Sequence, residues 1–221
     1  MRLRPTCLVD RDPVGRAVAE VVALLTPLPE PRLAVPGGSA AAAVGPIREA
    51  LGDRWRHVLL TYTDERCVPF DSAESNRGEL HRSGALSDAH PPGHELPLYL
   101  DGERPHVAAM RASLPFRRRF NDRLDVVLLG LGPDGHVASL FPGHAHAGSD
   151  TLIAHIEDSP KPPPWRVTLT HSALMRSTHN VVLAFGPSKR PALERALRGE
   201  PGLPTSGLPG LVFITDQELP S

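Results

Sequence analysis

The chain has 221 residues, enough to bury a sizeable core, and residues 1–221 are expected to form a single domain. Its 24 basic and 25 acidic residues leave a net charge of −1, which gives no electrostatic footprint for nucleic acid or an anionic membrane. No apolar run is long enough for a membrane span or a signal core, and Cys7 and Cys67 have neither metal-ligand nor redox spacing. A reduced, cytoplasmic protein is therefore expected.

Apolar strands and helical segments alternate along the first half of the chain. Asp12 followed by Pro13 is typical of a helix N-cap and first turn. The patterns predict strands at residues 7–9, 32–35, 57–63 and 96–100, and helices at residues 12–25, 46–51, 74–83 and 103–119.

The second half continues this alternation. A short apolar stretch at residues 137–141 is predicted to form a helix of fewer than two turns, closed by Pro142 and Gly143. Further strands are predicted at residues 125–129, 151–156, 166–170, 180–185 and 211–215, and helices at residues 171–177 and 188–198. The order predicts an α/β fold with a mostly parallel sheet, in a single layer with helices on both faces.

Residues 125–136 (DVVLLGLGPDGH) are the predicted functional centre. A strand buried on both faces ends in a glycine-rich loop, and His136 follows at once. Open α/β sheets place their ligands at the carboxyl ends of such strands. Imidazole titrates near neutral pH, so His136 is the candidate general base. Asp134 is a candidate to orient that ring, although an aspartate here can equally cap its own loop.

The same loop matches a dinucleotide fingerprint, with Gly130, Gly132 and Gly135 at the required spacing and Asp150 at the distance of a ribose-binding acid. That fingerprint must open a long helix, but Pro142 and Gly143 close this one early. A nicotinamide or flavin site is therefore disfavoured, and a dehydrogenase is the weakest interpretation.

Two glycines and a hydroxyl, Gly37, Gly38 and Ser39, lie between a predicted strand and a helical segment. They are either an anion cradle or an ordinary turn. Asp64 and Arg66 follow the strand at residues 57–63, where charges are costly to bury unless they are paired or bind a ligand.

Lys161 lies in a stiff, proline-rich loop at residues 159–165, and Arg166 follows it at the start of a strand. Only Lys161 and Lys189 are lysines among the 24 basic residues. Such selective use indicates positions that need a compact ammonium group, or chance retention. Lys189, after a glycine turn, is interpreted as structural or peripheral.

Zinc is an alternative interpretation of His136, His144 and His146, because histidines at such spacing occur in metal sites. No acidic or thiol ligand accompanies them, so no metal is expected.

Four segments resemble the 6-phosphogluconolactonase family, whose relatives include glucosamine-6-phosphate isomerases. They are PGGS (36–39), TDERCVPFDSAESN (63–76), GLGPDGHVASLFPGH (130–144) and SPKPPPWRVTLT (159–170), with a weaker match at Gly186-Pro-Ser-Lys189. Related deaminases typically carry Asn-Glu-Pro in place of the Ser-Leu-Phe-Pro of residues 139–142, which favours the lactonase side. The family usually continues PGGS with Thr-Pro, whereas this chain continues with alanines.

The resemblance implies a Rossmann-like fold shared with glucosamine-6-phosphate deaminase and ribose-5-phosphate isomerase, and no organic cofactor. It implies hydrolysis of 6-phospho-D-glucono-1,5-lactone to 6-phosphogluconate in the oxidative pentose phosphate pathway. The partner is then a small sugar-phosphate lactone, with no nucleic acid and no membrane, and the protein is a monomer or a small homo-oligomer.

In this interpretation His136 activates the water, and Asp134 orients or charge-balances its ring. Arg66 and Lys161 bind the phosphate. The further predicted binding residues are Gly37, Gly38, Ser39, Asp64 and Arg166, with Arg166 on the phosphate, near the oxyanion, or in an ordinary ion pair. Two alternatives remain open, an amino-sugar-phosphate isomerase or deaminase on the same fold and a sugar-phosphate-binding regulator without turnover.

Overall fold

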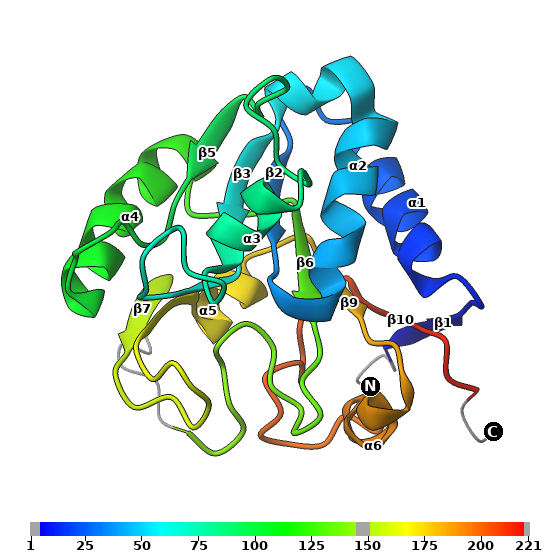
Figure 1. Ribbon diagram of the computed structural model, residues 1–221. Coiled ribbons are helices and arrows are strands. Elements are labelled where there is room, and N and C mark those ends of the chain that lie inside the picture. Colours follow the sequence, from blue (N-terminus) through cyan, green and yellow to red (C-terminus); the bar gives the residue numbers. More distant parts are fainter. Residues whose placement is uncertain (1–4, 145–150, 219–221) are drawn as a thin grey trace.

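The computed structural model describes residues 5–144 and 151–218, and its main feature is a seven-stranded sheet (Figure 1). All neighbouring strands of this sheet run parallel. From edge to edge they are β1 (Thr6–Val9), β10 (Leu211–Thr215), β9 (His179–Leu183), β6 (Val126–Gly130), β2 (Arg32–Val35), β3 (Leu59–Tyr62) and β5 (His94–Leu96). The predicted α/β class and parallel sheet are confirmed.

Helices pack on this sheet as the alternation of elements predicts. The helices are α1 (Pro13–Leu25), α2 (Val44–Leu51), α3 (Asn76–Arg82), α4 (Pro105–Phe120), α5 (His171–Met175) and α6 (Arg190–Leu197), with the 3₁₀ segments η1 (Gly38–Ala43), η2 (Gly52–His57) and η3 (Pro187–Lys189). Asp12 caps α1 as predicted, since its Oδ1 accepts the N–H of Gly15 at 2.9 Å. α1 packs against α2, β6, β9 and β10. Among the described residues, no helix combines the length and apolarity that a membrane crossing requires.

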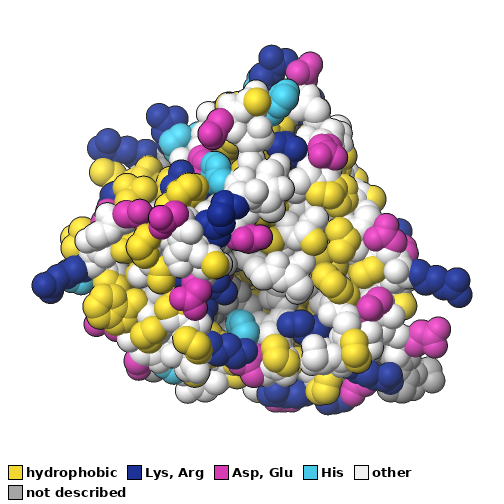
Figure 2. Space-filling view, viewed as in Figure 1, with side chains coloured by type: hydrophobic (Ala, Val, Ile, Leu, Met, Phe, Trp, Pro, Cys, Tyr) yellow, Lys and Arg dark blue, Asp and Glu magenta, His cyan; other side chains and the backbone are white. Residues whose placement is uncertain are grey.

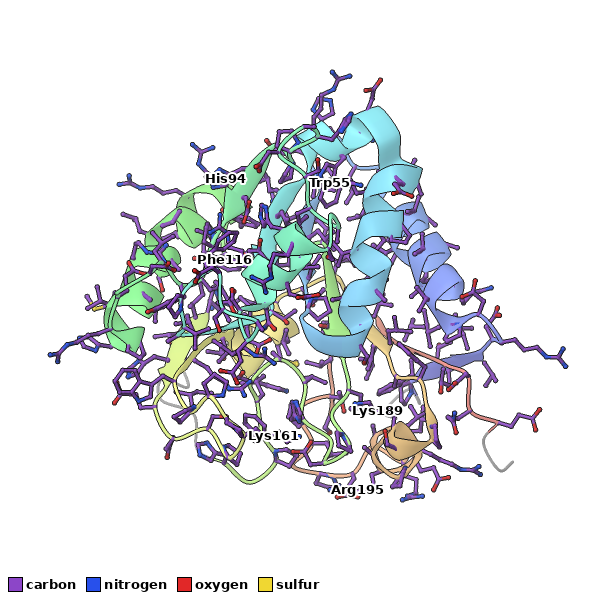
Figure 3. The ribbon with its side chains drawn as sticks, in the orientation of Figure 1. Trp55, His94, Phe116, Lys161, Lys189 and Arg195 are labelled. Atoms are coloured by element: carbon purple, nitrogen blue, oxygen red, sulfur yellow. The ribbon has the colours of Figure 1, made fainter. Side chains whose placement is uncertain are left out.

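The central strands form the core of the molecule. Every side chain from Val126 to Leu129 is fully buried, as are Leu33, Ala34 and Val35 on β2. These runs contain no alternating polar residues because both faces of the sheet are covered. Trp55 and Phe116 are buried beside the sheet. Lys161, Lys189 and Arg195 lie near the edge of the sheet at which β6 ends, below the β6 arrow in this view (Figures 1 and 3).

A second, three-stranded antiparallel sheet corrects the prediction of a single layer. It contains β4 (Asp64–Arg66), β8 (Arg166–Leu169) and β7 (Ile153–Ile156), in that order. β4 follows β3 after one residue and pairs Asp64 with Thr168 and Arg66 with Arg166. The charges after β3 were predicted as a strand end. They form a strand because their backbone groups pair with β8, a tertiary contact that propensity does not predict.

Three local predictions also differ from the structure. The strand predicted at residues 96–100 is β5, His94–Leu96. The helical segment predicted from Pro46 begins earlier, because η1 and α2 run almost continuously from Gly38. Residues 137–141 are not helical, since Ala138 has a φ of 50° and Val137 forms an isolated bridge to Leu140.

The strand order places a switch point between β2 and β6. From that boundary, β2, β3 and β5 follow one another toward one edge, while β6, β9 and β10 extend toward the other. Connections therefore leave the ends of β2 and β6 in opposite directions and open a crevice between them. The PGGS loop follows β2 and the glycine-rich loop follows β6, so both predicted ligand loops meet here.

Candidate active site

A cavity of about 300 Å³ lies at this switch point and collects most of the predicted site. In the space-filling view, basic and histidine side chains lie together in the lower half of this face (Figure 2). Among its lining residues are eight predicted ones, namely Gly37, Gly38, Ser39, Asp64, Arg66, His136, Lys161 and Arg166, together with Thr63, Asn76, Ala138 and Lys189. Asp134 is not part of the wall but contacts two residues that are.

His136 and Asp134 form a tight pair at the end of the β6 loop. Nδ1 of His136 lies 2.5 Å from Oδ1 of Asp134. An ionised carboxylate can only accept hydrogen bonds, so Nδ1 carries the proton and Nε2 keeps its lone pair. Burial lowers the pKa of His136 despite the opposing carboxylate of Asp134, and the charge of Lys161 lowers it further. The imidazole is therefore neutral at neutral pH, the state that a general base requires.

Lys161 completes this group from the loop between β7 and β8. Its Nζ lies 3.1 Å from Oδ2 of Asp134 and 3.3 Å from Nδ1 of His136. Because Nδ1 already donates to Asp134, the bond formed by the ammonium is the one to the carboxylate. Burial disfavours the ionised form of Asp134, but hydrogen bonds and charge from His136 and Lys161 outweigh it, and the pKa falls to about 2.

Two glycines are required by close approach rather than by turn geometry. A Cβ at Gly132 would overlap the His136 ring and the Asp134 carboxylate. A Cβ at Gly37 would overlap the side-chain amide of Asn76. The structure therefore gives Gly37 a steric role in the cavity wall, while Gly38, with a φ of 63°, makes the turn into η1.

The start of α3 forms the wall beside the PGGS loop. Nδ2 of Asn76 donates to the carbonyl of Asp64 at 3.0 Å. The carboxylate of Glu65, buried in this wall, accepts the N–H groups of Asn76 and Arg77 at 2.8 and 2.7 Å. Burial raises the pKa of Glu65 against these backbone hydrogen bonds. Arg66 lies alongside and donates from Nη1 to the carbonyl of Glu74 at 2.7 Å.

Asp64 and Arg166 are the most deeply buried of the predicted charged residues, at 6 % and 4 % exposure. Nη1 of Arg166 lies 3.7 Å from Oδ2 of Asp64. Both side chains touch the cavity, but each is largely committed to protein partners. A buried pair of this kind supports the wall through its contacts on both sides.

Lys189 was interpreted as structural or peripheral, and the structure corrects this by placing it in the cavity wall. Burial lowers its pKa, and the charge of Lys161 lowers it further. The two lysines of the chain thus belong to one cavity (Figure 3). Their rarity was the available signal. Asn76 was also missed, although it closes the second resembling segment.

The metal and dinucleotide alternatives gain no support from the described residues. Among them, no three His, Cys, Asp or Glu side chains are close enough to share a metal ion. His144 packs edge-on against Phe141, with ring centroids 6.4 Å apart, and His146 and Asp150 lie outside the described residues. The loop after β6 enters a turn at Val137 rather than the long helix that a dinucleotide fingerprint needs.

A histidine–aspartate pair beside Lys161, at the switch point of a parallel sheet, places the chain among α/β proteins with a Rossmann-like fold and a cavity lined by basic side chains. The chain belongs to the family of glucosamine-6-phosphate isomerases/6-phosphogluconolactonase, whose model matches residues 14–211. The resemblance inferred from the four segments is confirmed.

Proteins similar to this chain include several named lactonases. A probable chloroplastic 6-phosphogluconolactonase 3 of Oryza sativa subsp. indica is 33 % identical over 222 residues, covering 92 % of this chain and 64 % of its own. The 6-phosphogluconolactonase of Rattus norvegicus is 40 % identical over 165 residues, covering 72 % and 62 %. The chain therefore spans slightly less than two thirds of these relatives.

Solved structures extend the likeness over nearly the whole fold. A 6-phosphogluconolactonase from Thermotoga maritima has a TM-score of 0.79 at 28 % identity, covering 95 % of this chain and 97 % of its own. A monomeric glucosamine-6-phosphate deaminase has a TM-score of 0.77 at 16 % identity, covering 96 % of each chain, and shares the fold alone.

Proposed function

We propose that this protein hydrolyses 6-phospho-D-glucono-1,5-lactone to 6-phosphogluconate. The observation that carries the proposal is a neutral His136, paired with the ionised Asp134, in the same cavity as Arg66, Lys161 and Lys189. A lactone needs an activated water and a site for the carbonyl oxyanion, and its phosphate needs cations. The named lactonases among its relatives support the same substrate.

The phosphate is assigned to Arg66 and Lys189, with N–H and hydroxyl groups of Gly38 and Ser39. The sequence predicted Lys161 in this role. Lys161, however, pairs with Asp134 and lies beside the His136 ring, so we assign it to the carbonyl oxygen at the reacting end. Asp64 and Arg166, predicted as binding residues, are assigned instead to supporting the wall.

The reaction then proceeds in two steps. Nε2 of His136 takes a proton from a water molecule, whose oxygen attacks the lactone carbonyl carbon, and the resulting oxyanion lies near the Lys161 ammonium. Asp134 stabilises the imidazolium. The oxyanion then collapses, the bond between the carbonyl carbon and the ring oxygen breaks, and His136 returns its proton to that oxygen. The products are the open-chain hydroxyl and the carboxylic acid, which ionises.

We also propose that residues 1–221 form one domain, and that the protein acts in the cytoplasm as a monomer or a small homo-oligomer. Free Cys7 and Cys67 accord with a reducing compartment.

A coupled assay tests the proposal by generating the lactone in place and following its loss against the spontaneous rate. We expect a large acceleration, and no ammonia from glucosamine 6-phosphate. Ammonia release without lactone loss would assign the deaminase alternative. Binding of 6-phosphogluconate without either activity would assign the regulator.

A further inference from the structure

The two loops that carry the reacting groups come from different sheets. His136 follows β6 of the parallel sheet, and Lys161 lies between β7 and β8 of the small antiparallel sheet. Their side chains nevertheless meet on Asp134 within hydrogen-bond distance. The two side chains are partly exposed to solvent, yet both lie within hydrogen-bond distance of Asp134. A contact elsewhere must therefore fix the His136 loop relative to the Lys161 loop.

Arg166 fixes the loop of Lys161. Its Nη2 donates to the carbonyls of Lys161 and Pro162, each at 3.1 Å, and its Nε donates to the carbonyl of Pro163, also at 3.1 Å. The planar guanidinium thus holds three consecutive carbonyls in a single geometry. Only Nη1 remains, and it points to the other loop.

Ser139 receives that contact three residues after His136. Its hydroxyl accepts from Nη1 of Arg166 at 3.3 Å and donates to Oδ2 of Asp64 at 2.6 Å. Its backbone N–H donates to Oγ1 of Thr168 on β8 at 3.2 Å. The side chain has no exposure to solvent, so water cannot replace these partners.

We propose that Ser139 is a positioning residue, whose hydroxyl, shared between Asp64 and Arg166, fixes the His136 loop against the Lys161 loop. The contacts form a closed ring that runs from His136 through Asp134 to Lys161, through Arg166 to Ser139, and back along three residues of chain. The catalytic part of this inference rests on the proposed lactone hydrolysis, whereas the positioning of the imidazole does not.

Removing the hydroxyl opens the ring at one point. In Ser139→Ala, Asp64 loses its short donor and Arg166 loses its acceptor, so the Lys161 loop is held less tightly against the His136 loop and can shift away from the ring. The charged groups that face the His136 ring are Asp134, Lys161 and Asp64, of which Lys161 lowers its pKa and the two carboxylates raise it. Retreat of Lys161 together with more solvent around the ring therefore raises the pKa of His136.

The test compares Ser139→Ala with Ser177→Ala. Ser177 is a matched control, because its hydroxyl is also buried and donates to the carbonyl of Leu174 at 2.6 Å, outside the cavity. The His136 imidazole is titrated by NMR in the wild type and in both variants, and kcat and KM are measured for the same three proteins. We expect an upward shift of the His136 titration and a kcat lowered by about 10–100-fold only in Ser139→Ala, with KM little changed.

Ser139→Cys separates the hydrogen bonds from packing, since a thiol keeps the approximate volume but donates weakly. It should behave like Ser139→Ala, and it carries the test if the alanine variant does not fold. An unchanged His136 titration in either folded variant overturns the inference, as does full recovery in Ser139→Cys. Failure of the wild type to hydrolyse the lactone contradicts the proposed function instead, and the titration still decides the positioning role.

Discussion

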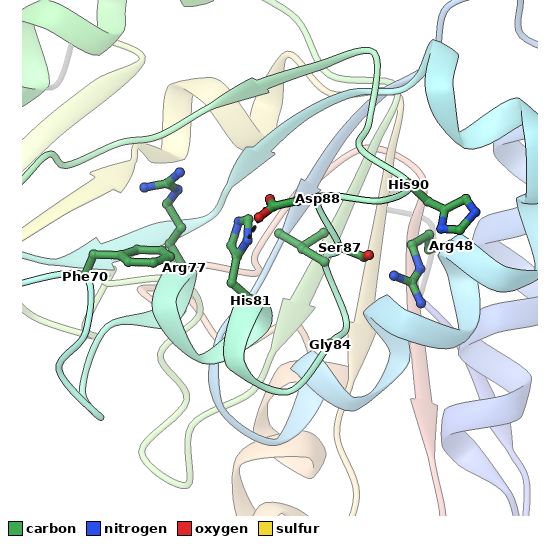
Figure 4. A pocket seen from close by; sticks show the side chains of 9 residues that line it. Arg48, Phe70, Arg77, His81, Gly84, Ser87, Asp88 and His90 are labelled. Atoms are coloured by element: carbon green, nitrogen blue, oxygen red, sulfur yellow. Dashed lines mark ion pairs between the residues drawn. The ribbon is translucent and has the colours of Figure 1, made fainter.

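The cavity at the switch point and a larger cavity beside α3 differ chiefly in how their charges are paired. The larger one, of about 630 Å³, lies between α2, α3 and the loop that follows α3 (Figure 4). Its wall contains Arg48, Phe70, Arg77, His81 and His90, so its residue types resemble those of an active site. Its volume is about twice that of the cavity around His136.

In the larger cavity, the cations are neutralised by neighbouring carboxylates. Nε of Arg77 donates to Oε1 of Glu95 at 2.6 Å, and Nε2 of His81 lies 3.5 Å from the second oxygen. Burial disfavours the charge on Glu95, but hydrogen bonds from His81, Tyr62 and Arg77 outweigh it and lower its pKa to about 2. The guanidinium of Arg77 also lies over the Phe70 ring at 4.7 Å.

Around His136, fewer of the charged and hydrogen-bonding groups are paired with one another. Asp134 engages one imidazole nitrogen and leaves Nε2. Three acids in or beside the wall, Asp64, Glu65 and Asp134, are outnumbered by four cationic side chains, Arg66, Lys161, Arg166 and Lys189. An excess of positive charge attracts a dianion, and a free imidazole nitrogen can accept a proton. Volume alone would select the larger cavity, whereas the unpaired positive charge and the available imidazole nitrogen favour the smaller one.

The largest expected difference is between the two histidines. His136→Ala should lower kcat by about 10²–10⁴-fold, because the water loses its general base, while affinity for 6-phosphogluconate is nearly retained. His81→Ala, in the larger cavity, should leave kcat within about twofold, as expected for a residue outside the chemistry. Steady-state kinetics and product titration measure both effects. Near-normal turnover by His136→Ala would remove this residue from the mechanism.

The second comparison removes one cation from each cavity and measures the effect on KM. Lys189→Ala should raise KM by about 10–100-fold, since one charge-assisted hydrogen bond contributes roughly 1.5–3 kcal/mol and about 1.4 kcal/mol is a factor of ten. Arg48→Ala removes a half-buried cation from the larger cavity and should leave KM unchanged. Equal effects from the two variants would contradict the assignment of the phosphate to the switch point.

The smallest expected effect is a shift in pH dependence. Turnover needs neutral His136, so the rate falls as pH drops through its pKa, and burial places that pKa below the ordinary value. Half-maximal kcat/KM should therefore lie below about pH 6.5, the usual value for histidine. Asp134→Asn should move this midpoint down and Lys161→Gln should move it up, because the two charges act in opposite directions. Shifts of the same sign would contradict the arrangement around the ring.

Local patterns in the sequence predicted the scaffold but not all of the site. β2 and β10 have the predicted bounds, because buried parallel strands are continuous apolar runs. β4 was missed because Asp64, Glu65 and Arg66 are poor strand formers whose pairing depends on a segment 100 residues away. Lys189 was undervalued for a similar reason, since only the strand order brings the turn after β9 to the loops after β2 and β6.

The comparison between 6-phosphogluconolactone and the same lactone without its phosphate tests the central claim most directly. A neutral ring offers few groups to bind, whereas the phosphate engages Arg66 and Lys189 and positions the distant carbonyl near His136. The account predicts kcat/KM at least about 10³-fold lower for the plain lactone, roughly 4 kcal/mol of binding used in the transition state. The gap should narrow in Lys189→Ala and persist in Arg48→Ala. Equal turnover of the two lactones by the wild-type protein would contradict the account.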